Sequence, residues 1–157
     1  MTEVLKGIAA SSGIAIGKAF ILSEPNFHVE KTTIEDPGKE MERFLQAIEQ
    51  SKAELQAIRD KTVAEMGTEN AAIFDAHILV LSDPELLASV DGKINSEYVN
   101  APFALKETAK MYITMFEQLD NDYMRERAAD IRDVTKRVIS HLLDIKVVDL
   151  QAINEAV

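Results

Sequence analysis

The segment Ala71-Ala72-Ile73-Phe74-Asp75-Ala76-His77-Ile78-Leu79-Val80-Leu81 is followed at once by Ser82-Asp83-Pro84-Glu85. The first eleven residues are apolar around most of a helix's circumference, so this helix must be buried or must offer a surface to another molecule. Ser82 and Glu85 have the spacing of a capping box, and Pro84 suits the first turn of a new helix. We therefore expect the helix to break near Ser82 and to form a bent apolar ridge edged by carboxylates.

Three more amphipathic helices are predicted around this ridge. Residues 39–66 carry apolar side chains three, four or seven positions apart, and Gly67 then favours the left-handed conformation of a helix end. A third helix should begin at 100–102 and run to about 119, and a turn at 120–122 should lead into a last helix over 123–143. Since short links favour antiparallel neighbours, the expected fold is mainly α, an antiparallel four-helix bundle with a kinked second helix.

The start of the chain has a different pattern. Residues 4–10 and 14–22 are rich in β-branched side chains and are separated by Ser11-Ser12-Gly13, which predicts an N-terminal β-hairpin. A polar connector with two prolines follows over 25–38. These changes in residue pattern predict three parts of the chain: strands in 1–24, a helical domain in 25–144, and a segment over 145–157 that returns toward the strands.

The composition narrows the functional classes. The chain has 157 residues, 46% of them hydrophobic, and 17 Lys and Arg against 27 Asp and Glu give a net charge of −10. This charge favours basic partners and opposes binding to nucleic acids and anionic membranes. The absence of cysteine excludes disulfides and thiol chemistry. Because there is neither a signal-peptide pattern nor an apolar run long enough to span a bilayer, we expect a cytoplasmic protein.

The residues themselves predict no catalytic group and no metal site. His28, His77 and His141 lack metal-ligand spacing, and neither a phosphate-binding glycine loop nor a G-x-S-x-G elbow occurs. His77 allows two interpretations: a core histidine whose ring nitrogens bond to backbone or hydroxyl groups, or a contact residue at an interface. The surplus of apolar side chains on the ridge favours the interface.

Three blocks of the sequence resemble one known family. They are KGIAASSGIAIGKA at 6–19, AIFDAHIL at 72–79 and DYMRERAADIRD at 122–133. They are similar to the N-terminal part of enzyme I, the phosphoenolpyruvate-protein phosphotransferase of the bacterial sugar phosphotransferase system, and the similarity is collinear over nearly the whole chain. The resemblance implies an enzyme that takes a phosphoryl group from phosphoenolpyruvate onto its own histidine and passes it to the small carrier protein HPr. It also implies that 25–144 is the HPr-binding domain, inserted into an α/β phosphohistidine domain to which the hairpin and 145–157 belong.

Carried over position by position, the resemblance implies an HPr-docking surface on the second helix and the facing parts of the third and fourth. Its apolar centre would comprise Ile73, Val80, Leu86, Phe116 and Met124, with His77 among them. Glu69, Asp83 and Glu85 would form an acidic rim, and Arg127 a polar anchor. From the residues alone, the apolar side chains could equally belong to the core and the carboxylates could cap helices.

Parts of the family's machinery are missing from this sequence. The phosphorylated histidine of the family lies in a G-G-x-T-S-H motif, of which Ser140-His141 matches only two letters on a predicted helix. Magnesium, which the resemblance implies for the full-length enzyme, would bind with phosphoenolpyruvate in a C-terminal barrel. We therefore expect this chain to dock HPr without transferring a phosphoryl group.

Three alternatives stay open. The chain could be a stand-alone helical interaction module for another basic partner, or part of the nitrogen-regulatory paralogue of enzyme I. Because isolated strands leave their edges unpaired, residues 1–22 and 145–157 could also mediate self-association with a second copy.

Overall fold

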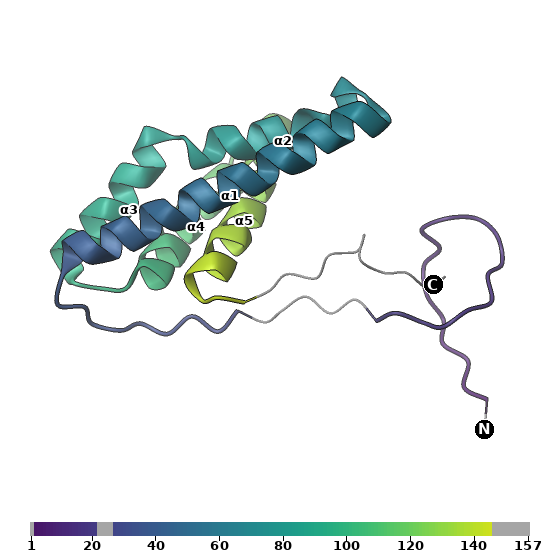
Figure 1. Ribbon diagram of the computed structural model, residues 1–157, viewed down its shortest axis with the longest axis horizontal. Helices are drawn as coiled ribbons and strands as arrows, with labels where there is room; N and C mark the ends of the chain where they lie inside the picture. Colours follow the sequence, from purple (N-terminus) through teal and green to yellow (C-terminus); the bar gives the residue numbers. More distant parts are fainter. Residues whose placement is uncertain (1, 22–26, 146–157) are drawn as a thin grey trace. The chain divides into compact units, whose positions relative to one another are not determined.

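The computed structural model describes residues 2–21 and 27–145, which fall into two units, with all the helices in the second. Within 27–145 five helices follow one another: α1 (Pro37–Met66), α2 (Thr68–Leu81), α3 (Pro84–Glu97), α4 (Ala101–Glu117) and α5 (Asp122–Leu142) (Figure 1). Each predicted helical segment is helical, but the expected four-helix bundle is wrong in its number of helices, because the break near Ser82 divides the kinked second helix into the separate helices α2 and α3. None of the helices in the described part of the chain is long and apolar enough to cross a membrane.

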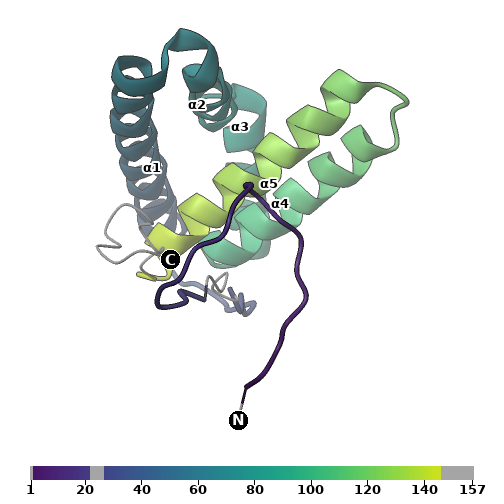
Figure 2. The ribbon, with the colours of Figure 1, turned by 90° about the vertical axis from the view of Figure 1, so that its right-hand side faces the viewer.

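The helices are arranged as two antiparallel pairs, α1 with α2 and α4 with α5 (Figure 2). Helix α5 also contacts α1 and α2, and α3 contacts α4, so one core lies between the pairs. Of the side chains predicted to face inward on the first helix, Phe44, Ile48 and Leu55 are buried, whereas Met41 and Ile58 are only half-buried. The other helices contribute the large buried side chains Leu81, Val90, Ile94, Leu105, Val134 and Val138.

The break between α2 and α3 differs from the predicted capping box. Ser82 belongs to the end of α2, because its backbone N–H and its hydroxyl both donate to the carbonyl oxygen of Ile78, at 3.1 and 2.9 Å. Asp83 is the N-cap of α3, and its carboxylate accepts a hydrogen bond from the N–H of Glu85 at 2.9 Å. Pro84 explains the shift by one residue, since a residue before proline is driven to the extended backbone that an N-cap needs.

The predicted N-terminal β-hairpin is wrong, because the described residues contain no β-strand. Residues 4–21 bend at the expected turn, where Gly13 has a φ of +115°, but they form no ladder. Their large apolar side chains are exposed, Ile8, Ile14 and Ile16 almost completely. A strand is stabilised by the backbone groups of a neighbour and by burial of one face, and two strands alone supply little of either. Leu22 and the predicted return segment after Ile145 lie outside the described residues.

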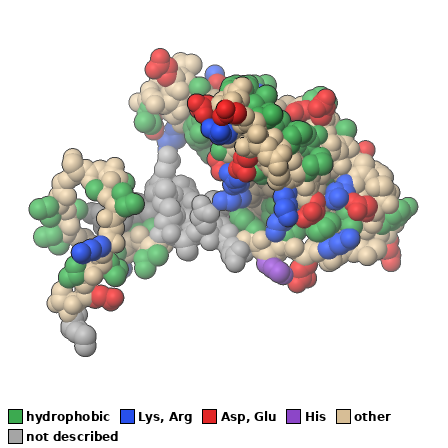
Figure 3. All heavy atoms as spheres, turned by 180° about the vertical axis from the view of Figure 1, so that it is seen from behind, with side chains coloured by type: hydrophobic (Ala, Val, Ile, Leu, Met, Phe, Trp, Pro, Cys, Tyr) green, Lys and Arg blue, Asp and Glu red, His purple; other side chains and the backbone are tan. Residues whose placement is uncertain are grey.

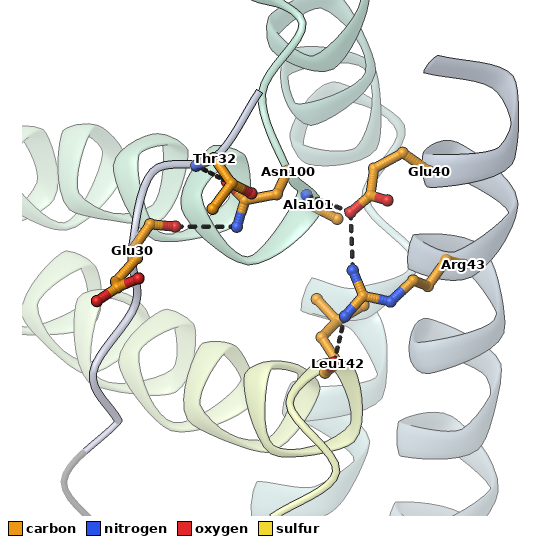
Figure 4. A network of polar contacts seen from close by, with 7 residues as sticks. All are labelled: Glu30, Thr32, Glu40, Arg43, Asn100, Ala101 and Leu142. Atoms are coloured by element: carbon orange, nitrogen blue, oxygen red, sulfur yellow. Dashed lines mark hydrogen bonds and ion pairs between the residues drawn. The ribbon is translucent and has the colours of Figure 1, made fainter. Parts of the chain in front are cut away.

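The segment that leads into α1 is tied to the connection between α3 and α4. Asn100 accepts a hydrogen bond from the N–H of Thr32 at 2.9 Å and donates to the carbonyl oxygen of Glu30 at 3.1 Å (Figure 4). Thr33 and Val99 form an isolated antiparallel bridge beside them. Residues 30–34 are thus held against the helical unit over several residues before α1 begins.

Candidate functional site

A pocket of about 410 Å³ opens where the α2–α3 junction meets α4 and α5, and we call it the junction pocket. From the junction it is lined by Leu79, Val80, Ser82, Asp83, Pro84, Glu85 and Leu86, from α4 by Tyr112 and Phe116, and from α5 by Arg127 and Ile131. The break in the apolar segment creates this pocket, because it turns the chain at Asp83 and places the start of α3 beside the end of α2.

The junction pocket brings together six of the ten residues that the resemblance implies for docking. These six are Val80, Asp83, Glu85, Leu86, Phe116 and Arg127. The other four, Glu69, Ile73, His77 and Met124, do not line it. Glu69 and Ile73 are exposed on α2, Met124 is half-buried on α5, and His77 is buried.

The pocket has an apolar floor and a charged rim. Val80, Leu86 and Ile131 are buried, whereas Asp83 and Glu85 are exposed at the start of α3. A negative charge at this position also interacts favourably with the N-terminus of α3. The pocket therefore has buried apolar side chains at its base and exposed carboxylates at its edge.

Two aromatic side chains of α4 form one wall. The rings of Tyr112 and Phe116 lie 6.2 Å apart between centroids, in tilted contact. The hydroxyl of Tyr112 lies 3.1 Å from the hydroxyl of Ser89 on α3, which fixes the Tyr112 ring between two helices. Phe116 is half-buried, so part of its ring faces the pocket as a preformed contact.

Arg127 supplies the positive group of the pocket. Its guanidinium lies 5.5 Å from the ring centroid of Tyr123, one turn earlier on α5, and its Nη2 donates to the Tyr123 hydroxyl at 3.0 Å. These contacts hold a long side chain in one orientation, which lowers the entropy lost when it binds a partner. The other guanidinium N–H groups of Arg127 are chemically suited to donate to a carbonyl or carboxylate oxygen.

His77 lies behind the pocket and is only 8% exposed. Its Nε2 is 3.2 Å from the Oδ1 of Asp130 on α5, and Phe74 contacts its ring edge-on with centroids 6.4 Å apart. Among the described residues, this nitrogen makes no aligned hydrogen bond to any group, so its contact with Asp130 is an approach of charged or polar atoms and not a hydrogen bond. The ring thus faces a carboxylate from another helix, an arrangement that neither interpretation of the sequence included.

Sequence reasoning missed five residues of the pocket lining: Leu79, Ser82, Pro84, Tyr112 and Ile131. The signal for Leu79 was present in the surplus of apolar residues along the second helix, and this side chain is 63% exposed at the pocket. Tyr112 and Ile131 fit the inward-facing pattern of their helices, which could not distinguish a pocket wall from the core. Ser82 and Pro84 were identified only as residues of the helix break.

The chemistry of the pocket is that of recognition. Ser82 carries the one aliphatic hydroxyl of the pocket lining, and this hydroxyl donates a hydrogen bond to the carbonyl oxygen of Ile78. Within the described part of the chain, no group of three or more His, Cys, Asp or Glu side chains is placed to hold a metal ion. Acidic, basic and hydrophobic side chains are interspersed over the face of the helical unit in Figure 3. The fold and the pocket together define a helical domain with an apolar pocket that is edged by charged side chains.

Comparison with known proteins identifies the family of this domain. Residues 6–127 match the family described as "PEP-utilising enzyme, N-terminal", and the chain belongs to that family. It is 56% identical over 155 residues to the phosphoenolpyruvate-protein phosphotransferase of Bacillus subtilis, covering 99% of this chain and 27% of that protein. It is 54% identical over 157 residues to the enzyme of the same name from Priestia megaterium, and this match covers 100% of this chain and 27% of that protein. The chain thus spans about a quarter of the length of these relatives.

Two solved structures share the fold. A solution structure titled as Enzyme I (nEIt) matches with a TM-score of 0.85 and 38% identity, over 96% of this chain and 62% of that one. The structure titled "N-terminal domain of Enzyme 1 - Nitrogen" matches with a TM-score of 0.69 and 29% identity, over 77% and 50% of the two chains. Both the sequence and the fold are therefore more similar to the first of these two structures than to the nitrogen-system domain.

Proposed function

We propose that this chain is the N-terminal, HPr-docking part of an enzyme I that acts in the cytoplasm, where the whole protein transfers a phosphoryl group from phosphoenolpyruvate to HPr. One observation carries the proposal: the junction pocket gathers six of the ten positions that the resemblance implies for carrier binding. Four of the six lie close together in the sequence, within residues 80–86, and the fold brings Phe116 of α4 and Arg127 of α5 to them.

The physical basis of docking follows from the composition of the pocket. Leu79, which is 63% exposed, and the half-buried Phe116 provide the apolar surface whose removal from water stabilises a complex, above the buried Val80 and Leu86. Asp83 and Glu85 attract a positively charged carrier, and the net charge of −10 adds a long-range attraction of the same sign. Such charges chiefly raise the association rate and set the orientation, while the apolar centre slows dissociation.

Docking is separate from phosphoryl transfer. Transfer needs a nucleophile in line with the phosphoryl group and groups that neutralise its charge. The junction pocket supplies apolar contacts, two carboxylates and one guanidinium, which serve binding. We therefore propose that the chain alone binds HPr without accepting a phosphoryl group. No ligand cluster among the described residues fits magnesium, so no step of this proposal involves the metal.

The test is a calorimetric titration of HPr into the chain and into two leucine variants. Leu79→Ala removes a side chain that is 63% exposed at the pocket, and Leu45→Ala removes one that is 42% exposed on α1, away from it. We expect Leu79→Ala to weaken binding by about tenfold and Leu45→Ala by less than about twofold. Equal effects of the two substitutions, or no binding by the unmodified chain, would contradict the proposal.

The same titration separates the alternative functions. A stand-alone module for another basic partner would bind an unrelated basic protein as tightly as HPr, whereas an enzyme I domain should prefer HPr. The nitrogen-regulatory alternative receives less support from the comparisons, since the nitrogen-system structure matches this chain at 29% identity against 38% for the Enzyme I structure.

A further inference from the structure

The contact between His77 and Asp130 lies one helical turn behind the junction pocket. His77 precedes the pocket residue Val80 by three positions on α2, and Asp130 follows Arg127 by three positions on α5. Ile131, the next residue along α5, also lines the pocket. The pair therefore joins two of the helices that line the pocket.

The pair is largely withdrawn from water. The side chains of His77 and Asp130 are 10% and 18% exposed, and their facing atoms, Nε2 and Oδ1, are 3.2 Å apart. Nε2 has essentially no accessible surface. Nε2 makes no aligned hydrogen bond, so the Asp130 carboxylate that faces it at 3.2 Å is what offsets its burial, and a shift of α2 relative to α5 that separates the two atoms is opposed. Apolar contacts alone are less directional and would allow the helices to slide.

We propose that His77 and Asp130 are positioning residues that fix α2 against α5 and thereby set the shape of the junction pocket. Their role in binding rests on the proposed function, because the pocket matters only if a carrier docks there. Asp130 is new in this role: it neither lines the pocket nor belongs to the surface that the resemblance implies. His77 then acts through Asp130, and its imidazole is not itself the contact made with the carrier.

A second histidine-carboxylate contact provides a matched control. His141 Nε2 lies 3.1 Å from Glu54 Oε2, joining α5 to α1, and this nitrogen is also buried without an aligned hydrogen bond. Neither residue lines the junction pocket. Glu54 Oε2 also accepts a hydrogen bond from Arg137 Nη1 at 2.8 Å, so Glu54→Ala breaks two contacts, whereas His141→Ala reports the cost of breaking one such contact without altering the walls of the pocket.

The experiment measures the dissociation constant of HPr for the unmodified chain and for three variants, Asp130→Ala, His77→Ala and the double substitution. If the two residues act as one unit, each single substitution should weaken binding by about tenfold, and the double substitution should weaken it by about tenfold as well. If they act independently, the double substitution should weaken binding by about a hundredfold. Asp130→Asn should stay within about threefold of the unmodified chain, because an amide of the same shape keeps an oxygen that can face Nε2. Glu54→Ala and His141→Ala should change binding by less than about twofold.

Several outcomes would overturn the positioning role. Weaker binding by His77→Ala with no effect of Asp130→Ala would make His77 a direct contact. Equal effects of Asp130→Ala and Glu54→Ala would reduce the role to general stability. Circular dichroism checks that each variant folds, and Asp130→Ser replaces Asp130→Ala if the alanine variant does not.

A readout that needs no partner separates this inference from the proposed function. Methyl signals of Val80, Leu86 and Ile131 in carbon-proton spectra should shift in Asp130→Ala and stay in place in Glu54→Ala. If the unmodified chain does not bind HPr, the proposed function fails, and these shifts alone decide whether the pair sets the shape of the pocket. Unmoved methyl signals together with unchanged binding would refute the positioning role while leaving docking intact.

Discussion

Glu40 on α1 accepts a hydrogen bond from the backbone N–H of Ala101, the first residue of α4, with its Oε1 2.8 Å from that nitrogen (Figure 4). The side chain of Asn100, the N-cap of this helix, makes no capping hydrogen bond. The same Glu40 oxygen accepts from Arg43 at 2.8 Å, and Arg43 also donates to the carbonyl oxygen of Leu142 at the end of α5. One turn of α1 thus satisfies the start of α4 and the end of α5.

Removing this cap should destabilise the helical unit. Glu40→Ala leaves the N–H of Ala101 without its acceptor, and we expect the free energy of unfolding to fall by about 1–2 kcal/mol. Glu40→Gln keeps an oxygen acceptor and should cost less. The control is Glu42→Ala, which removes an exposed glutamate two positions further along α1. It should stay within about 0.5 kcal/mol of the unmodified chain. Urea denaturation measures all three, and equal losses for Glu40→Ala and Glu42→Ala would contradict the role of the cap.

Two neighbouring residues of α1 should differ sharply in their effect on stability. Phe44 is 0% exposed, whereas Leu45 is 42% exposed. Phe44→Ala should lower the free energy of unfolding by about 3–5 kcal/mol, because it removes apolar contact and leaves a cavity. Leu45→Ala should cost less than about 1 kcal/mol. Thermal unfolding compares the two, and a small loss for Phe44→Ala would mean that the core does not close around α1 as described.

Lys93 and Glu97 allow a prediction about pH. Lys93 Nζ lies 2.9 Å from Glu97 Oε2 on α3, and its hydrogen bond lowers the pKa of Glu97, with further lowering by the charges of Lys93 and Lys31. Because the pKa of Glu97 is lowered in the folded state, this contact stabilises the fold at pH values above the ordinary pKa of 4.5. The stabilisation is lost as the pH falls through the pKa that Glu97 has in the folded chain. Lys93→Met should raise the pKa of Glu97 toward 4.5, as followed by NMR titration of its carboxyl carbon. Lys106→Met is the control, and an unchanged pKa in Lys93→Met would rule out this hydrogen bond in solution.

Local signals in the sequence predicted the helices well. Gly67 ends α1 as expected, but its φ of 89° and ψ of 170° differ from the predicted left-handed helical conformation, although glycine adopts both readily. Asn121 caps α5 by accepting from the N–H of Tyr123 at 2.9 Å. At the α2–α3 break the position was found but the cap was assigned to Ser82, because the effect of Pro84 on Asp83 outweighs the capping-box spacing. These features depend on residues within one turn of each other.

Features that depend on distant residues were not predictable in the same way. The β-branched pattern of residues 4–21 has strand propensity, but propensity cannot supply the neighbouring backbone that a ladder needs. Asp130 could not be assigned as the neighbour of His77, because 53 positions separate them and only the crossing of α2 and α5 brings them together. The six pocket residues were found through the resemblance, while amphipathic patterns alone left the pocket wall and the core indistinguishable.

Asp83 combines two roles that substitutions can separate. Its carboxylate caps α3 through the N–H of Glu85, and it also lies on the rim of the junction pocket. Asp83→Ala should lose both roles, with a fall of about 1 kcal/mol in the free energy of unfolding, whereas Asp83→Asn keeps a good cap and loses only the charge.

Kinetics of HPr binding then isolate the charge. Both Asp83 substitutions should slow association about two- to fivefold at low ionic strength, and the difference should vanish near about 0.5 M salt, where screening is strong. Glu85→Gln, which removes a rim charge without touching the cap, should slow association to a similar extent and lower the free energy of unfolding by no more than about 0.5 kcal/mol, the interaction of its charge with the start of α3. If Asp83→Asn associates as fast as the unmodified chain at low salt, Asp83 serves the helix cap alone, and the acidic rim does not steer the carrier into the pocket.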